Sequence, residues 1–194
     1  KLPIMVVICL VVGFGIDYCL FKPSKINRYI ASNVYKESAN TDFVDNVFYQ
    51  CVIDAYNEEN KVRYPYTYSL NVDELNTIKT LTCNTYNGTI TSTDGIEKIN
   101  TLEKLDLTGH GITDIYLGSN QKLTTLILSN NILTSIDLSN NALLEDLVMF
   151  GNSLTNLDIS KNIKLNYLDV SNNQLTSLNV KNNSHLNVLK MSSN

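Results

Sequence analysis

The second half of this chain repeats itself every 21 residues. Apolar residues return at this interval in three places: Leu102, Leu123, Leu144, Leu165 and Leu186; Leu105, Leu126, Leu147, Leu168 and Leu189; and Leu107, Leu128, Met149, Val170 and Met191. An uninterrupted series of this kind is typical of a solenoid, in which each copy forms one turn of a coil and stacks on its neighbours. One turn alone cannot bury enough apolar surface to offset the entropy lost on ordering it, so stacking must stabilise the fold.

Each period also contains a second, similar half. Its apolar pairs are Ile115 and Leu117, Ile136 and Leu138, Leu157 and Ile159, and Leu178 and Val180. We therefore expect two short extended segments on opposite walls of each turn, with alternate residues pointing inward. Asparagine closes both halves, at Asn131, Asn152, Asn173 and Asn194 and at Asn120, Asn141, Asn162 and Asn183, and His110 takes the first place in the former set. We interpret all of them as structural, because an amide can pair with backbone groups buried inside a turn.

A helical region precedes the repeats. Apolar residues at three- and four-residue spacing predict an amphipathic helix over 42–57, with Thr41 as its N-cap and Asp42 and Asp45 in its first turn. Asn71 and Glu74 resemble a capping box for a second short helix, VDELNTI. Leu81 and Cys83 alternate with Thr, as in a first strand.

Cys51 and Cys83 allow two interpretations. If this region is extracellular, they could form a disulfide, which would contribute roughly 3–4 kcal/mol in the chain-entropy model. The alternative, which we favour from the sequence, is a pair of buried free thiols that pack as small apolar side chains.

The first segment, 2–21, is apolar over about the length that spans a bilayer. Lys22, Pro23 and Lys25 follow it with no small-residue cleavage site, which favours a retained membrane anchor over a cleaved signal or a buried helix. Taken alone, these lysines and Arg28 would keep the rest of the chain in the cytoplasm. Lysines upstream of Lys1 would reverse that balance, so the orientation stays open. The sequence thus divides into an anchor (1–22), a linker (23–40), an N-terminal cap (41–95) and about five repeats (96–194).

Residues 71–194 resemble the internalin-like bacterial leucine-rich repeat proteins. The resemblance rests on the L-x-x-L-x-L-x-x-N-x-L pattern and on LTSIDLSNN (133–141) and LTNLDISKN (154–162). It implies an α+β fold, a right-handed leucine-rich repeat solenoid with a small helical N-terminal cap. It also implies a non-enzymatic cell-surface module that binds a protein or carbohydrate on its concave sheet. The chain departs from the family in its apparent anchor and in stopping at Asn194 inside a repeat, so we expect the natural protein to continue.

The outward positions of the main strand define a candidate binding surface. Apolar residues stand where a solvated sheet should be polar, at Ile127, Val148, Phe150, Tyr167 and Val188, with Asp146, Asp169 and Lys190 as a polar rim. Contiguous exposed apolar residues tend to mark interaction sites. The alternatives are that they only stabilise the strands, or that following residues cover them.

Other functional classes find little support. A net charge of -4 disfavours a nucleic-acid partner. We find no phosphate-binding loop, no pair of His at metal spacing and no Ser or Cys with a base nearby, so we predict no enzyme activity, cofactor or metal. Asp137 and Asp158 could share Ca²⁺ on adjacent turns, but two carboxylates are too few. The main alternative function is a rigid spacer or targeting arm for a further C-terminal domain.

Overall fold

The computed structural model describes residues 43–84 and 88–194. The predicted anchor (1–22) and linker (23–40) lie outside the described residues and stay predictions. Neither of the two α-helices in the described part is long and apolar enough to cross a membrane.

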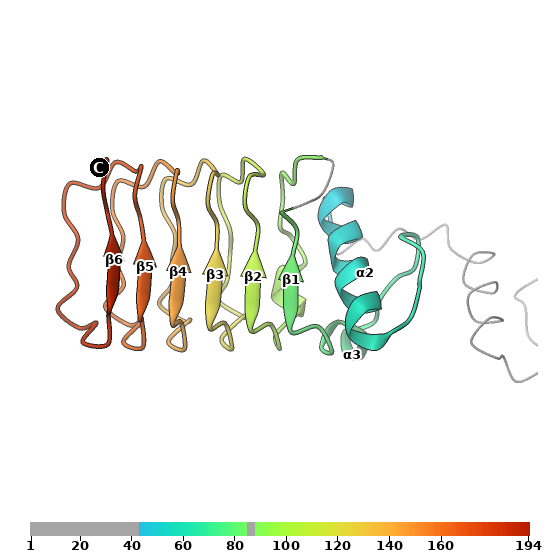
Figure 1. Ribbon diagram of the computed structural model, residues 1–194. Helices are drawn as coiled ribbons and strands as arrows, with labels where there is room; N and C mark the ends of the chain where they lie inside the picture. Colours follow the sequence, from blue (N-terminus) through green and yellow to red (C-terminus); the bar gives the residue numbers. More distant parts are fainter. Residues whose placement is uncertain (1–42, 85–87) are drawn as a thin grey trace, which may run out of the picture. The chain divides into compact units, whose positions relative to one another are not determined.

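Six short parallel strands form one sheet along the repeats (Figure 1). They are β1 Thr80–Thr82, β2 Lys104–Asp106, β3 Thr125–Ile127, β4 Asp146–Val148, β5 Tyr167–Asp169 and β6 Val188–Lys190. The central leucine of each strand is the register partner of the next, from Leu81 to Leu189. The 21-residue spacing therefore predicted the positions and register of β2–β6, and the predicted α+β solenoid with a small helical cap is confirmed.

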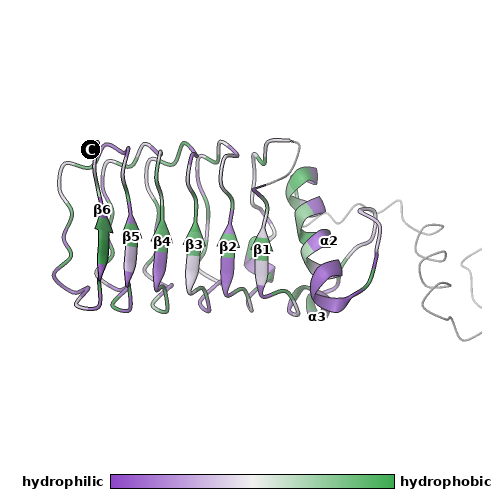
Figure 2. Ribbon diagram, in the orientation of Figure 1, coloured by the Kyte–Doolittle hydropathy of each residue, from purple (hydrophilic) through white to green (hydrophobic). Residues whose placement is uncertain are grey.

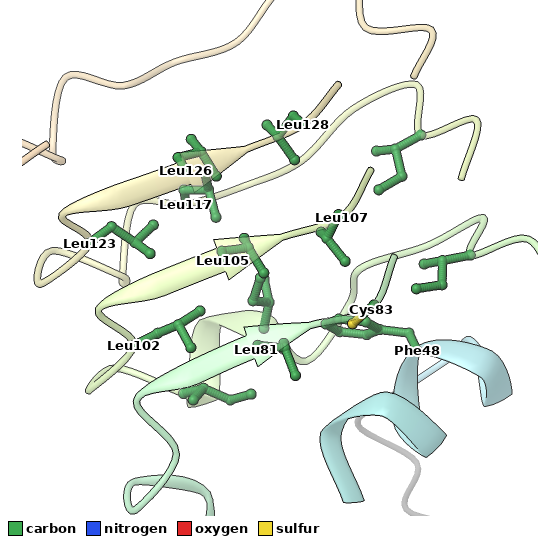
Figure 3. Close-up of a cluster of buried hydrophobic side chains, with 14 of the residues drawn as sticks. Phe48, Leu81, Cys83, Leu102, Leu105, Leu107, Leu117, Leu123, Leu126 and Leu128 are labelled. Carbon is green, nitrogen blue, oxygen red and sulfur yellow. The ribbon is translucent and has the colours of Figure 1, made fainter. Parts of the chain in front are cut away.

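The core is one continuous cluster that runs from the cap through the stacked turns. Leu105, Leu126 and Leu147 are fully buried from the strand side, and Leu117 and Leu138 are 1% exposed from the opposite wall. Figure 3 shows Leu105, Leu117 and Leu126 layered turn upon turn, with Phe48 reaching from the cap helix toward Leu81 and Cys83. Each turn thus buries its apolar residues against the next, as stacking stabilisation requires.

The opposite wall differs from the prediction in one respect. Its apolar residues point inward as expected, but within residues 88–194 it forms no strand. On this wall, side-chain carboxylates accept hydrogen bonds from backbone N–H groups: Asp137 accepts from Ser139 N at 2.9 Å and Asp158 accepts from Ser160 N at 2.8 Å. Asp106 and Asp169 of the strand wall accept from Thr108 N and Ser171 N in the same way, so this local bond is common to both walls.

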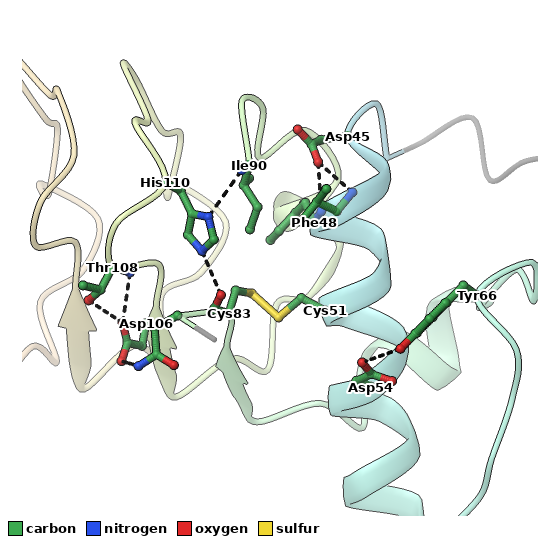
Figure 4. The surroundings of a disulfide bond; sticks show 12 residues. Asp45, Phe48, Cys51, Asp54, Tyr66, Cys83, Ile90, Asp106, Thr108 and His110 are labelled. Atoms are coloured by element: carbon green, nitrogen blue, oxygen red, sulfur yellow. Dashed lines mark hydrogen bonds between the residues drawn. A yellow bond between two sulfur atoms is a disulfide. The ribbon is translucent and has the colours of Figure 1, made fainter. Parts of the chain in front are cut away.

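The asparagine column of the strand wall comprises His110, Asn131, Asn152, Asn173 and Asn194. The Asn152 Oδ1 accepts from Leu133 N at 3.1 Å, and its Nδ2 donates to the carbonyls of Leu128 and Met149 at 2.9 and 3.1 Å. His110 fills the same role with its ring, since Nδ1 accepts from Ile90 N and Nε2 lies 2.8 Å from the Cys83 carbonyl (Figure 4). The structural interpretation of this column is consistent with every bond it makes.

The asparagine column of the opposite wall comprises Asn120, Asn141, Asn162 and Asn183. Each Nδ2 bridges two carbonyls of the preceding turn; that of Asn162 donates to Leu138 and Asn141 at 3.1 and 2.9 Å. Each Oδ1 is buried and has no hydrogen-bond partner among the described residues. These amides therefore act as donors only.

The cap helix α2, Asn46–Asn60, begins later than predicted. Asp45 is its N-cap and accepts from Val47 N and Phe48 N at 2.8 and 2.9 Å, so the prediction of Thr41 as N-cap with two acidic residues in the first turn is wrong. Asp45 also accepts from Thr91 N at 2.7 Å, which fixes it outside the helix. Figure 2 shows apolar residues in the first half of α2 and hydrophilic residues toward its end.

The second helix, α3, is Val72–Leu75, with the Asn71–Glu74 capping box in place as predicted. It is shorter than the predicted VDELNTI, because the chain already turns at Thr77, whose N–H donates to Glu74 O. A 3₁₀ turn, η1, covers Ile96–Lys98.

A disulfide joins Cys51 of α2 to Cys83, directly after β1 (Figure 4). The Cα atoms are 5.6 Å apart and both residues are almost fully buried. The free-thiol interpretation that we favoured from the sequence is therefore corrected. Sequence spacing could not decide it, because only the packing of α2 on the first turn brings the two residues within bonding distance.

Candidate binding face

The outward residues of the sheet form two rows in register. The first row is Thr80, Lys104, Thr125, Asp146, Tyr167 and Val188, and the second is Thr82, Asp106, Ile127, Val148, Asp169 and Lys190. Adjacent members of a row lie about one strand spacing, roughly 4.8 Å, apart. A partner lying across the sheet would therefore meet side chains from several turns at once.

Apolar side chains gather on one half of this face. Ile127 and Val148 are register partners, as are Tyr167 and Val188, and Phe150 lies two residues beyond Val148. We call these five residues the apolar patch. Val188 is 39% exposed and the other four are half-buried. The structure thus brings the predicted apolar residues together over β3–β6.

The end of the face nearest the cap is polar. Thr80, Thr82, Lys104 and Thr125 occupy it, together with Asp106. Asp106 is 7% exposed, and its carboxylate accepts from Thr108 N, Thr108 Oγ1 and Asn84 Nδ2 (Figure 4). The face therefore changes from polar to apolar along the axis of the coil.

Lys190 and Asp169, two of the predicted rim residues, are paired. Lys190 Nζ lies 4.0 Å from Asp169 Oδ2 and 5.2 Å from the centre of the Tyr167 ring. A hydrogen bond with the Tyr167 side chain, helped by the Asp169 charge, raises the pKa of Lys190. The Asp169 carboxylate also accepts from Ser171 N at 3.0 Å. Lys190 and Asp169 therefore form an ion pair at the edge of the face.

Asp146, the third rim residue, differs from the other two carboxylates of the rows. It is half-buried in the first row between Thr125 and Tyr167, and its carboxylate makes no hydrogen bond or ion pair with residues 43–84 or 88–194. Its charge therefore stands unpaired beside the apolar patch.

Solved structures of internalins share this architecture. The functional domain of InlJ from Listeria monocytogenes, which includes a cysteine ladder, superposes with a TM-score of 0.72 at 34% identity, covering 78% of this chain and 32% of that one. Internalin C2 of the same organism gives a TM-score of 0.54 at 27% identity, covering 78% and 76%. The protein is an internalin-like leucine-rich repeat protein.

A third structure, the internalin InlF of Listeria monocytogenes, shares the fold with a TM-score of 0.57 at 24% identity, covering 76% of this chain and 49% of that one. This internalin-like chain thus spans about a third of the length of InlJ and half that of InlF. No protein-family model and no curated protein gives a significant match to its sequence. The InlJ structure includes a cysteine ladder, whereas the repeat columns of this chain carry asparagine and none of its four cysteines lies beyond Cys83.

The opposite wall of this internalin-like protein carries the predicted pair Asp137 and Asp158. The hydroxyl and amide of Ser139 lower the pKa of Asp137, and the amide and hydroxyl of Ser160 lower that of Asp158. Within the described part of the chain, no group of three or more His, Cys, Asp or Glu could hold a metal ion. The two carboxylates act on their own turns.

Two parts of the face were not recognised from the sequence. Thr80 and Thr82 extend both rows onto the cap strand, although their alternation with Leu81 and Cys83 carried the signal. The contact of Lys190 with Tyr167 was missed because it joins different rows and different strands. The sequence places residues in rows readily, but which long side chains meet across rows depends on their conformations.

Proposed function

We propose that this protein is a non-enzymatic binding module that recognises a protein or glycan through the outward face of its sheet. The observation that carries the proposal is the apolar patch over β3–β6, on a sheet whose remaining outward positions are polar or charged. Covering apolar surface of this kind with a partner removes it from water and lowers the free energy, which favours binding. The rim residues Asp146, Asp169 and Lys190 would then set orientation and specificity.

The sheet is a rigid support for such recognition. Each strand is held by its register partners, and the asparagine column behind it fixes the turn that follows. A preformed face loses little conformational entropy on binding, so more of the contact free energy appears as affinity.

The proposed location is the outer side of a membrane, with residues 2–21 as the anchor. The Cys51–Cys83 disulfide supports this side, because disulfides persist in oxidising compartments and are rare in the cytosol. We give this disulfide more weight than Lys22 and Lys25, because the effect of these lysines on membrane orientation depends on the residues at the other end of the anchor. Protease treatment of intact cells, with lysed cells as control, tests this point. Cleavage of the repeats only after lysis would contradict the proposed location.

The binding face is tested with Val148→Asp/Phe150→Asp. Full-length wild type and variant are screened against one panel of extracellular proteins and glycans. We expect the wild type to retain a partner that the variant loses by at least a hundredfold, because two charges would be buried in the contact. The matched control is Ser135→Asp/Ser177→Asp on the opposite wall, where both serines are exposed.

Equal binding by both double variants would contradict the assignment of the apolar patch. Circular dichroism and thermal unfolding of each variant exclude loss of fold as the cause. If no partner binds either protein, the spacer or targeting-arm alternative gains support.

A further inference from the structure

The outward rows of the sheet contain three aspartates, and one of them lacks a partner among residues 43–84 and 88–194. Asp106 is bonded to Thr108 and Asn84, and Asp169 is bonded to Ser171 N and paired with Lys190. The carboxylate of Asp146 makes no such contact within the described residues. A half-buried carboxylate with free lone pairs, set within a face proposed to bind a partner, is a ready acceptor for an incoming donor.

The neighbours of Asp146 restrict what that donor can be. Its register partner on β5 is Tyr167, one strand spacing of roughly 4.8 Å away. On β4 itself, Val148 follows two residues later on the same face, and Ile127 is the register partner of Val148. The carboxylate therefore has an aromatic ring on the neighbouring strand β5 and one branched aliphatic side chain, Val148, two residues along its own strand.

A partner that covers the apolar patch must also remove water from Asp146. Burying this carboxylate unpaired would cost several kcal/mol, whereas a cation supplied by the partner offsets the cost. A guanidinium fits best, because its planar fork pairs with a carboxylate and its flat face packs on an aromatic ring. The net charge of -4 on this chain also favours the approach of a basic partner.

The spacing along β4 indicates the form of that partner. Positions 146 and 148 are two residues apart on one face of a strand, which is about 6.6 Å. In an extended polypeptide, side chains two residues apart lie on one face at the same distance. Such a segment could place a cation on Asp146 and an apolar side chain on Val148, Ile127 and Phe150 together.

A glycan fits these observations less well. Ile127 and Val148 offer branched aliphatic surface rather than a flat ring on which a sugar could stack. These side chains also supply no hydrogen bonds for sugar hydroxyls.

We infer that the apolar patch binds an extended polypeptide segment in which an arginine contacts Asp146 and Tyr167 and an apolar residue two positions away contacts Ile127, Val148 and Phe150. This inference rests on the proposed function and adds the chemical class of the partner. It assigns Asp146 as the residue that determines specificity within the patch.

An array of immobilised nine-residue peptides tests it. The peptides carry Leu-x-Arg, Leu-x-Lys, Leu-x-Gln or Leu-x-Glu in a Ser/Gly background, in both directions. The probe is the full chain, labelled and held in mild detergent. We expect the arginine peptides to retain roughly ten times as much wild-type protein as the glutamine peptides, with lysine between them.

The matched variants are Asp146→Asn and Glu145→Gln, which remove the same charge from neighbouring positions. The Glu145 side chain is exposed and stands outside both rows. We expect Asp146→Asn to abolish the preference for arginine and Glu145→Gln to leave it unchanged. Asp146→Lys should reverse the preference toward glutamate.

The outcomes separate this inference from the proposed function. Binding that Val148→Asp abolishes, but that shows no preference for arginine, overturns the inference and leaves the proposed function standing. Binding that is unchanged by Val148→Asp contradicts both. Retention of no peptide, with a glycan captured in the wider screen and lost by the double variant, overturns the polypeptide assignment alone.

Discussion

The two walls of the solenoid carry the same amide every 21 residues but use it differently. On the strand wall, Asn152 bonds at both ends, as acceptor from Leu133 N and donor to the carbonyls of Leu128 and Met149. On the opposite wall, Asn162 donates to two carbonyls, while its buried oxygen has no partner among the described residues. Identical periodicity in the sequence therefore does not imply an identical energetic role.

The difference follows from what each wall does with its backbone. The strand wall ends in a turn whose N–H groups point inward and need an acceptor, which the amide oxygen supplies. On the opposite wall the turn N–H groups are bonded to backbone carbonyls, as Asn162 N donates to Ile159 O and Leu165 N donates to Asn162 O. The proposed binding face lies on the wall whose turns are fixed from both directions.

The walls also differ in how they meet the cap, and here we expect the largest effect. The disulfide from α2 attaches to the strand wall, directly after β1. Cys51→Ser/Cys83→Ser removes a cross-link between residues that are 32 positions apart in the sequence. The double variant should lower the free energy of unfolding by about 3–4 kcal/mol. Urea unfolding measures the loss. Reductant should produce the same change in the wild type and none in the variant. A loss below about 1 kcal/mol would contradict this role of the disulfide.

The two asparagine columns can be compared directly by alanine substitution. Asn152→Ala leaves one N–H and two carbonyls without the bonds they now make, and should cost about 3 kcal/mol. Asn162→Ala leaves only two carbonyls without their donor and also removes an unpartnered oxygen. We therefore expect the free energy of unfolding to fall by about 1–2 kcal/mol. Urea unfolding of both variants at one pH tests the order. Equal losses would indicate that the Asn162 oxygen has a partner, such as a water, and that the two columns are equivalent.

The smallest effect concerns the aspartates on the surface of the opposite wall. Hydrogen bonds from Ser139 and Ser160 lower the pKa values of Asp137 and Asp158 below their usual 3.8. A lowered pKa in the folded state means that these groups stabilise the fold above about pH 4, and that this stabilisation disappears as the pH falls through the lowered values.

Asp158→Asn should therefore lower the urea midpoint slightly at about pH 6 and make less difference at about pH 2.5. Asp146→Asn on the strand wall is the comparison, because the Asp146 carboxylate accepts no hydrogen bond from the described part of the chain. If Asp158→Asn changes the urea midpoint more at about pH 2.5 than at about pH 6, the stabilising role assigned to the ionised Asp158 carboxylate is contradicted.

Much of the fold was predictable from particular residues. The leucines at 105, 126 and 147 fixed the strands and their register, and Asn71 with Glu74 located α3. The start of α2 was not predictable, because Asp45 is held by Thr91, which is 46 residues away in the sequence. Local patterns cannot report a contact of that range.

The candidate site divides in the same way. Alternation along each strand predicted that Val148 and Tyr167 face outward, and the 21-residue interval put them on neighbouring turns. That Lys190 pairs with Asp169 while Asp146 stays unpaired followed only from the side-chain positions. All three had been assigned the same role in the polar rim.

The sequence by itself determined the coil, because a strict 21-residue period and alternating apolar residues leave stacked turns as the way to bury those residues. Only the tertiary structure decided which wall forms the β-ladder, that Cys51 meets Cys83, and which carboxylate on the face lacks a partner. The physical reason is the sequence separation over which each interaction acts. Periodic burial joins neighbouring turns, so the repeated sequence is enough to predict it. A disulfide or an ion pair instead requires particular side chains from distant positions to meet within a few ångströms.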